Sequence, residues 1–251
     1  MVATVLGVLA VVGGGWAGPG TAASGSTREL WLRFDRSSET GLDLANSGRA
    51  SVDAEVSAVG ATITSVRRKE GRALRLPTFT ETPAAAVVAV RSTGSTDLLA
   101  PGSRDFVVGA TFRLDRTSQG SAYDNGDNLI QRGAYAGPQY KVQLDDRRPS
   151  CRVAGPRGAV FVAASVRVSP RYWHQVRCRR VADRVTLELV TFHDGTSTRR
   201  RWSRSGPIGS LDHAAGTALT IGGKVHGDGT VNATDSDQFN GRVDDAMFRL
   251  L

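Results

Sequence analysis

The stretch Phe106-Val-Val-Gly-Ala-Thr-Phe-Arg-Leu114 decides the fold class of this chain. Every second residue in it is apolar, and in an extended strand alternate side chains point to the same face. One face of this segment therefore carries Phe106, Val108, Ala110, Phe112 and Leu114. A face of this kind predicts a β-strand with one side buried in a core.

Short runs with the same period, or rich in β-branched and aromatic residues, recur on both sides of this segment. They are Glu29–Phe34, Ala73–Leu76, Ala85–Val90, Asn128–Gln131, Tyr140–Leu144, Val160–Val168, Trp173–Val181, Val185–Phe192, Ala218–Ile221 and Arg242–Leu250. Gly, Pro, Asn or Asp separate them, as in the turn signal His193-Asp194-Gly195. More than ten strands without alternating helices predict an all-β sandwich of two antiparallel sheets. No linker divides the region, so we expect residues 24–251 to form one domain.

The composition excludes several classes of protein. The 251-residue chain has 40% hydrophobic residues and two cysteines, which excludes a disordered protein and a disulfide-dense miniature scaffold. It carries 32 Lys+Arg against 24 Asp+Glu, a net charge of +8. The basic residues form short clusters, several alternating with apolar residues as in Val176-Arg177-Cys178-Arg179, which is typical of a solvated strand face. Since no nucleic-acid-binding motif accompanies them, we expect no nucleic-acid partner.

The N-terminus resembles a leader for export. Residues Val2–Val12 are almost entirely apolar or small, and Thr21-Ala22-Ala23 offers a small-residue cleavage site. The run is too short to span a bilayer comfortably, so residues 1–23 are predicted to be a signal-peptide-like leader. No Lys or Arg precedes Arg28, which departs from a usual signal peptide, and an anchor that stays attached is the alternative. We expect a secreted protein with no stable membrane span once the leader is removed.

Export would place the two cysteines in an oxidising compartment. Cys151 and Cys178 both lie in strand-like segments, and in an oxidising compartment we expect them to form a disulfide. Neither has a Cys or His partner at zinc-finger spacing, which disfavours a metal site. Two buried free thiols are the alternative.

Several sequence blocks together resemble one known superfamily. In order, they are Leu30-Trp-Leu-Arg-Phe-Asp35, Gly41-Leu-Asp-Leu-Ala-Asn-Ser-Gly48, Phe106-Val-Val-Gly-Ala-Thr-Phe112, Asn128-Leu-Ile-Gln-Arg-Gly133, Tyr172-Trp-His-Gln-Val-Arg-Cys178, Val185-Thr-Leu-Glu-Leu189, Leu219-Thr-Ile-Gly-Gly223 and Phe239-Asn-Gly-Arg-Val-Asp-Asp-Ala-Met-Phe248. The domain they cover is similar to the laminin G-like, concanavalin A-like lectin/glucanase superfamily of exported bacterial proteins. This resemblance implies a jelly-roll sandwich and does not specify the function.

The glucanases of that superfamily supply a direct test for catalysis. Their two catalytic carboxyls come from a Glu-x-Asp-x-x-Glu motif on one strand, where alternate residues share a face. The glutamates of this chain are Glu29, Glu39, Glu55, Glu70, Glu81 and Glu188, and none begins or ends that motif. We therefore expect no catalytic residues and no enzyme activity.

The resemblance also implies a possible calcium ion, because relatives often hold one. Calcium takes six to eight oxygen ligands, so clustered Asp and Asn residues are its signal. The first candidate set combines Asp35 or Asp43 with Asp244 or Asp245. The second pairs the loop 123–128 with residues 228–237, although ordinary turn chemistry explains the same residues. No other cofactor is expected.

Sugar recognition needs an exposed aromatic platform beside polar groups. Phe34, Phe106, Phe112, Trp173 and Phe248 fall on predicted inward faces, which leaves others for a ligand. The candidate ligand-binding residues are Tyr123, Asp124, Asp127, Tyr135, Tyr140 and Trp202. We expect an exported, non-catalytic binding module for a glycan or cell-envelope polymer. A structural or protein-binding envelope domain without sugar specificity is the alternative, and a glucanase is disfavoured by the missing acid pair.

Overall fold

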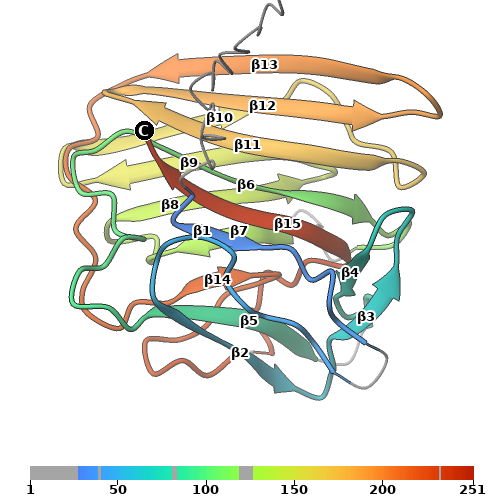
Figure 1. Cartoon of the computed structure of the whole chain (residues 1–251). Coiled ribbons are helices and arrows are strands. Elements are labelled where there is room, and N and C mark those ends of the chain that lie inside the picture. The colour runs from blue at the N-terminus through green and yellow to red at the C-terminus, as the bar shows by residue number, and fades with distance from the viewer. Residues whose placement is uncertain (1–27, 39–40, 81–83, 119–126, 232) are drawn as a thin grey trace, which may run out of the picture.

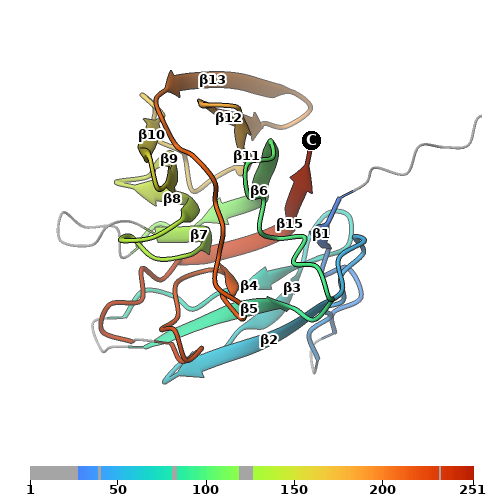
Figure 2. The same ribbon diagram turned by 90° about the vertical axis from the view of Figure 1, so that its left-hand side faces the viewer.

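A computed structural model describes residues 28–38, 41–80, 84–118, 127–231 and 233–251. The predicted leader, residues 1–23, lies outside these ranges, and so do Tyr123 and Asp124. Fifteen strands occur in the described part of the chain, all in two antiparallel sheets. Figure 2 shows the sheets as two layers, which confirms the predicted all-β sandwich.

The larger sheet faces the viewer in Figure 1. Its order is β13 (Ser197–Ser205), β12 (Arg184–Phe192), β11 (Trp173–Val181), β6 (Phe106–Leu114), β15 (Gly241–Leu250), β4 (Arg72–Arg75) and β3 (Thr64–Arg67), and β1 (Leu30–Leu32) also pairs with β15. The decisive segment of the sequence is thus a central strand, with β11 and β15 on its two sides.

The smaller sheet packs behind it. Its order is β10 (Gly158–Ala163), β9 (Arg148–Gly155), β8 (Gln139–Asp145), β7 (Asp127–Arg132), β14 (Leu219–Ile221), β5 (Ala85–Ser92) and β2 (Val52–Val59). Neighbours β7 to β10 follow one another along the chain as hairpins, whereas β14 and β5 are distant in sequence.

The strands missing from the sequence-based prediction lie at sheet edges. They are β2, β3 and β13, three of the four end strands of the two orders, whereas β9 was anticipated only as the strand-like segment around Cys151. The side chains of β2 and β13 are mostly exposed on both faces. Because an edge strand need not alternate apolar and polar residues, periodicity does not reveal it.

Aromatic side chains from both sheets meet in the core. Phe106 and Phe248 project from the larger sheet and Tyr140 from the smaller one, with ring centroids 5.3 to 5.6 Å apart. The predicted inward positions of Phe34, Phe106, Phe112 and Phe248 are confirmed, since each is at most 1% exposed. These large rings dominate the apolar area that holds the sheets together.

The predicted inward position of Trp173 is wrong. On β11, Val176 and Cys178 point into the core, and the period of two sends His174 inward with them. His174 is 1% exposed and lies 5.4 Å from the ring of Phe112. Trp173 therefore lies on the outer face, where the Arg68 guanidinium lies 4.6 Å from its ring.

The predicted disulfide is confirmed. Cys151 of β9 and Cys178 of β11 are bonded, with their Cα atoms 5.9 Å apart. Both cysteines are fully buried within the core, and they belong to opposite sheets. The bridge is therefore a covalent link between the two layers.

Candidate functional site

A hollow of about 1090 Å³ lies on the outer face of the smaller sheet. We call it the groove. The loops 133–138, 212–218 and 224–229 surround it, and its floor is formed by β7, β8 and β14 with Arg152 of β9 beside them. These loops join β7 to β8, β13 to β14 and β14 to β15, so segments far apart in sequence enclose one space.

The floor of the groove is polar although it is buried. Along β8, Tyr140, Val142 and Leu144 point into the core, so the intervening residues must point outward. The outward side chains on β7 and β8 are Gln131, Gln139, Lys141 and Gln143, each at most 9% exposed. Polar side chains beneath loops in this way are costly to bury unless they have partners.

Strand register places one row of side chains across the floor. Phe161 of β10 lies opposite Arg152 of β9, and Arg152 lies opposite Lys141 of β8. The row continues through Gln131 of β7 to Thr220 of β14. All five residues line the groove, which therefore changes from aromatic through cationic to neutral polar along the row.

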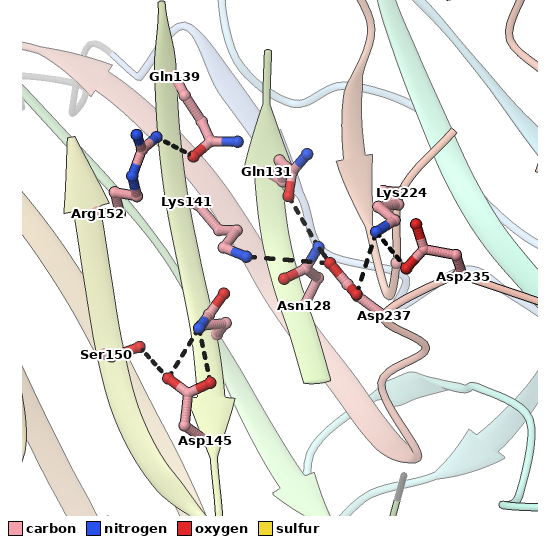
Figure 3. A network of polar contacts seen from close by, with 12 residues as sticks. Asn128, Gln131, Gln139, Lys141, Asp145, Ser150, Arg152, Lys224, Asp235 and Asp237 are labelled. Carbon is pink, nitrogen blue, oxygen red and sulfur yellow. Dashed lines mark hydrogen bonds and ion pairs between the residues drawn. The ribbon is translucent and has the colours of Figure 1, made fainter. Parts of the chain in front are cut away.

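Asp237 gathers polar groups at one side of the groove (Figure 3). The Nδ2 atom of Asn128 donates to Asp237 Oδ2 at 2.9 Å, and Lys224 Nζ donates to Oδ1 at 3.2 Å. Lys224 also donates to Asp235 at 2.8 Å, while Lys141 Nζ lies 3.9 Å from Asp237 Oδ2. This ion-pair cluster fixes the segment between β14 and β15 against β7.

A second polar group lies around Asp145, further along β8. The Nε2 atom of Gln143 donates to both oxygens of Asp145 at 2.8 Å, and the hydroxyl of Ser150 donates to the same carboxylate at 2.8 Å. The Oε1 atom of Gln143 is buried and has no hydrogen-bond partner among the described residues. It is therefore an unsatisfied acceptor that is shielded from solvent beneath the floor of the groove.

Aromatic rings lie at the edge of the groove. Tyr135 is 81% exposed and Phe161 is 43% exposed. The guanidinium of Arg152 lies 4.6 Å from the centre of the Tyr135 ring and donates to the Tyr135 carbonyl at 3.2 Å. It also donates to Gln139 Oε1 at 2.5 Å. Arg152 thus connects the floor to the loop 133–138.

Burial lowers the pKa of two side chains in the groove. It lowers the pKa of Lys141, against the opposing effect of Asp237 and Asp145, and Arg152 lowers it further. Burial and the nearby charge of Arg132 lower the pKa of His213 to about 4, so this imidazole is neutral at pH 7. The groove therefore offers amides, three carboxylates, a neutral imidazole and cations, a set suited to hydrogen-bonding a polar ligand.

Of the predicted ligand-binding residues that are described, only Tyr135 lines the groove. The prediction for Tyr140 is wrong, because this residue is fully buried and its hydroxyl donates to the Leu99 carbonyl at 2.9 Å. Asp127 is fully buried at the start of β7. Trp202 lies on β13 in the other sheet, partly packed against the core, and donates to Ser165 at 3.2 Å.

The sequence-based prediction did not include the side chains that form the floor of the groove. Gln139, Lys141, Gln143 and Asp145 alternate with apolar residues, which is the pattern of an ordinary solvated strand. That alternation shows which residues share a face. It cannot show that loops from elsewhere in the chain cover that face.

The first predicted calcium set is only partly brought together. Asp35, Asp244 and Asp245 line a second hollow of about 600 Å³ on the larger sheet, whereas Asp43 does not and accepts from the Ala45 amide. Arg68 forms an ion pair with Asp244 and lies 3.7 Å from Asp245. Because the Arg68 guanidinium already lies beside Asp244 and Asp245, this arrangement disfavours a calcium ion between them.

The second predicted calcium set meets at Asn128 and Asp237. The amide of Asn128 donates to the Asp237 carbonyl at 2.9 Å, in addition to the side-chain contact. The cation beside this pair is Lys224. Within the ranges that the structure describes, no group of three His, Cys, Asp or Glu residues could hold a metal ion, and calcium binding stays a prediction.

Comparison with known proteins identifies the fold. The binding domain of Paraclostridial Mosquitocidal Protein 1 superposes with a TM-score of 0.59 at 14% identity, over 90% of this chain and 49% of that one. The botulinum neurotoxin serotype G binding domain gives 0.57 at 11% identity, over 89% and 48%. The chain has a concanavalin A-like fold. It spans about half the length of those two binding-domain structures.

A third solved structure is described as catalytic. The enzymatically active domain of bacteriophage CBA120 tailspike protein 2 matches this concanavalin A-like chain with a TM-score of 0.50 at 11% identity, over 77% of this chain and 28% of that one. No protein-family model matches the sequence, and neither does any curated protein. These identities establish the fold alone.

In the described ranges, no helix is long and apolar enough to cross a bilayer.

Proposed function

We propose that this chain is an exported, non-catalytic binding module that holds a carbohydrate in the groove. The ligand class is a glycan or cell-envelope polymer. One observation carries the proposal: a row of polar side chains beneath loops ends in the exposed aromatic ring of Phe161, and the exposed ring of Tyr135 also lines the groove. A sugar presents hydroxyl groups around its edge and an apolar face of C–H groups, and this arrangement matches both.

The hydrogen-bonding capacity of the floor supports the proposal. Gln131, Gln139 and Gln143 line the groove with amide groups. Amides and carboxylates accept from sugar hydroxyls, and they also orient them because their geometry is planar. Asp145 and Asp237 are already held by amide, hydroxyl and ammonium donors, which suits binding more than acid catalysis.

Export and lack of catalysis belong to the same proposal. The disulfide between Cys151 and Cys178 is typical of oxidising compartments. Two solved structures, with TM-scores of 0.59 and 0.57, are described as binding domains. Because an enzymatically active domain also shares the fold, absence of hydrolysis has to be measured on the same glycans.

A glycan array probed with the intact chain tests the proposal. We expect binding to a restricted set of glycans, and no release of reducing ends from those glycans. Tyr135→Ala combined with Phe161→Ser should lower the affinity at least tenfold. The matched control is Phe79→Ser, since Phe79 is 38% exposed and does not line the groove. Absence of binding to every glycan, or equal loss in the control, would sink the proposal.

A further inference from the structure

Two cationic side chains face each other across the floor of the groove. Lys141 of β8 and Arg152 of β9 are paired in register, and both line the groove. Side chains directly opposite on antiparallel strands lie about 5 Å apart at Cβ, and like charges in such pairs destabilise the sheet. Figure 3 shows both side chains on the same side of the two strands.

Arg152 has only uncharged partners among the described residues. Its guanidinium donates to the amide oxygen of Gln139 and to the carbonyl of Tyr135, and no carboxylate oxygen there lies within 4.0 Å of it. Burial lowers its pKa. A half-buried guanidinium without a carboxylate partner keeps the capacity to pair with a planar anion through two parallel hydrogen bonds.

The positive charge of Lys141 is only weakly compensated by nearby carboxylates. Its nearest carboxylate oxygen among the described residues is Asp237 Oδ2 at 3.9 Å, beyond hydrogen-bond distance. That carboxylate already accepts from Asn128 and Lys224. Asp145, the other acid on the floor, lies four residues along β8 and is turned to Gln143 and Ser150. The cationic pair therefore forms a positively charged stretch of the groove floor, separate from the carboxylate of Asp145.

We propose that the groove binds an anionic sugar residue, whose acidic group lies between Lys141 and Arg152. This inference rests on the proposed carbohydrate function and deepens it. An acidic group there would accept charge-assisted hydrogen bonds from both cations and relieve their mutual repulsion. The next residues along the same row are Phe161, which can contact the sugar's apolar face, and Gln131, which can bond its hydroxyls.

The test compares polymers that differ only in charge. Polygalacturonate and its methyl ester share one backbone, and dextran sulfate and dextran share another. We expect the intact chain to bind at least one acidic polymer tenfold or more tightly than its neutral counterpart. Preference for polygalacturonate identifies a carboxylate as the acidic group, and preference for dextran sulfate identifies a sulfate ester.

Variants then locate the binding. Lys141→Gln and Arg152→Gln should each weaken binding to the preferred acidic polymer about tenfold, and should weaken binding to its neutral counterpart by a clearly smaller factor. Arg152→Lys keeps the charge and should retain most of the affinity. Arg179→Gln combined with Arg199→Gln is the matched control, because it removes two exposed charges from the outer face of the larger sheet. This control should bind like the parent protein.

Thermal unfolding without ligand gives a second readout. Lys141→Gln should unfold at the same temperature as the parent or above it, since it removes one of two facing charges without removing a hydrogen bond. Equal binding of acidic and neutral polymers would overturn the inference while leaving the proposed function standing. If the Arg179 and Arg199 control variant weakened binding to the acidic polymer as much as the groove variants, the inference would also be overturned. That result would indicate general attraction to the net charge of the protein. Binding to no glycan would remove the proposed function and the inference together.

Discussion

Cys151 of β9 and Cys178 of β11 join the two sheets through a disulfide that closes a loop of 27 residues. Cross-linking a loop of this length restricts the unfolded chain, which stabilises the fold by about 3.5 kcal/mol on the loop-entropy model. Replacing both cysteines with alanine should lower the free energy of unfolding by about that amount, measured by urea denaturation. Reduction of the parent protein should reproduce the loss, and an unchanged midpoint in both cases would contradict this account.

The loop that carries Tyr135 depends on a glycine. Gly133 has a φ of 81°, and a Cβ atom there would clash with the Pro138 carbonyl oxygen. Gly133→Ala should therefore destabilise the protein by about 1–2 kcal/mol or more and weaken glycan binding, because it displaces the loop. Gly137→Ala in the same loop is the control, since nothing lies within 4 Å of its would-be Cβ. Equal effects of the two substitutions in thermal unfolding would show that the loop conformation is not the cause.

Asp244 should make stability depend on pH. Burial and the nearby charge of Asp245 raise its pKa to about 6, from 3.8 in an unfolded chain, despite its ion pair with Arg68. The folded state therefore holds a proton that the unfolded state releases first, and this contribution is full below pH 3.8 and is lost as the pH rises through 6. The loss amounts to about 2–3 kcal/mol for a side chain this buried.

Asp244→Asn should remove that dependence. Relative to the parent, the variant should gain stability at pH 8 and gain nothing at pH 4, measured by denaturant unfolding at both values. Asp245→Asn is the companion variant, because loss of the Asp245 charge should lower the pKa of Asp244 and flatten the same profile in part. If the free energy of unfolding of the parent protein instead rose between pH 4 and pH 8 by this amount, the raised pKa assigned to Asp244 would be contradicted.

Tyr140 should affect stability and leave ligand binding unchanged. Its hydroxyl donates to the buried Leu99 carbonyl, and its ring packs between the sheets. Tyr140→Phe leaves that carbonyl without its donor, which should cost about 1 kcal/mol of unfolding free energy. Glycan affinity should match the parent, in contrast with the Tyr135 and Phe161 variant. A large loss of affinity would place Tyr140 in the ligand site after all.

The errors of the sequence-based prediction have physical causes. Trp173 is predicted on an inward face, but the strand phase is set by Val176 and Cys178, and a one-residue change of phase moves a side chain to the opposite face. Tyr140 is predicted as a ligand-binding residue because it lies beside a loop, but it is the second residue of β8 and its side chain points into the core.

The sequence by itself determined the sandwich, the central strands and the disulfide-bonded cysteines. Those features depend on alternation along single strands and on residue chemistry, which are local properties of the chain. Only the tertiary structure decided where the groove lies, because strand register places Arg152 opposite Lys141 and three distant loops enclose them. It also placed Arg68 among the predicted calcium ligands. Sites of this kind arise from pairing between distant segments, and no periodicity within one segment records that pairing.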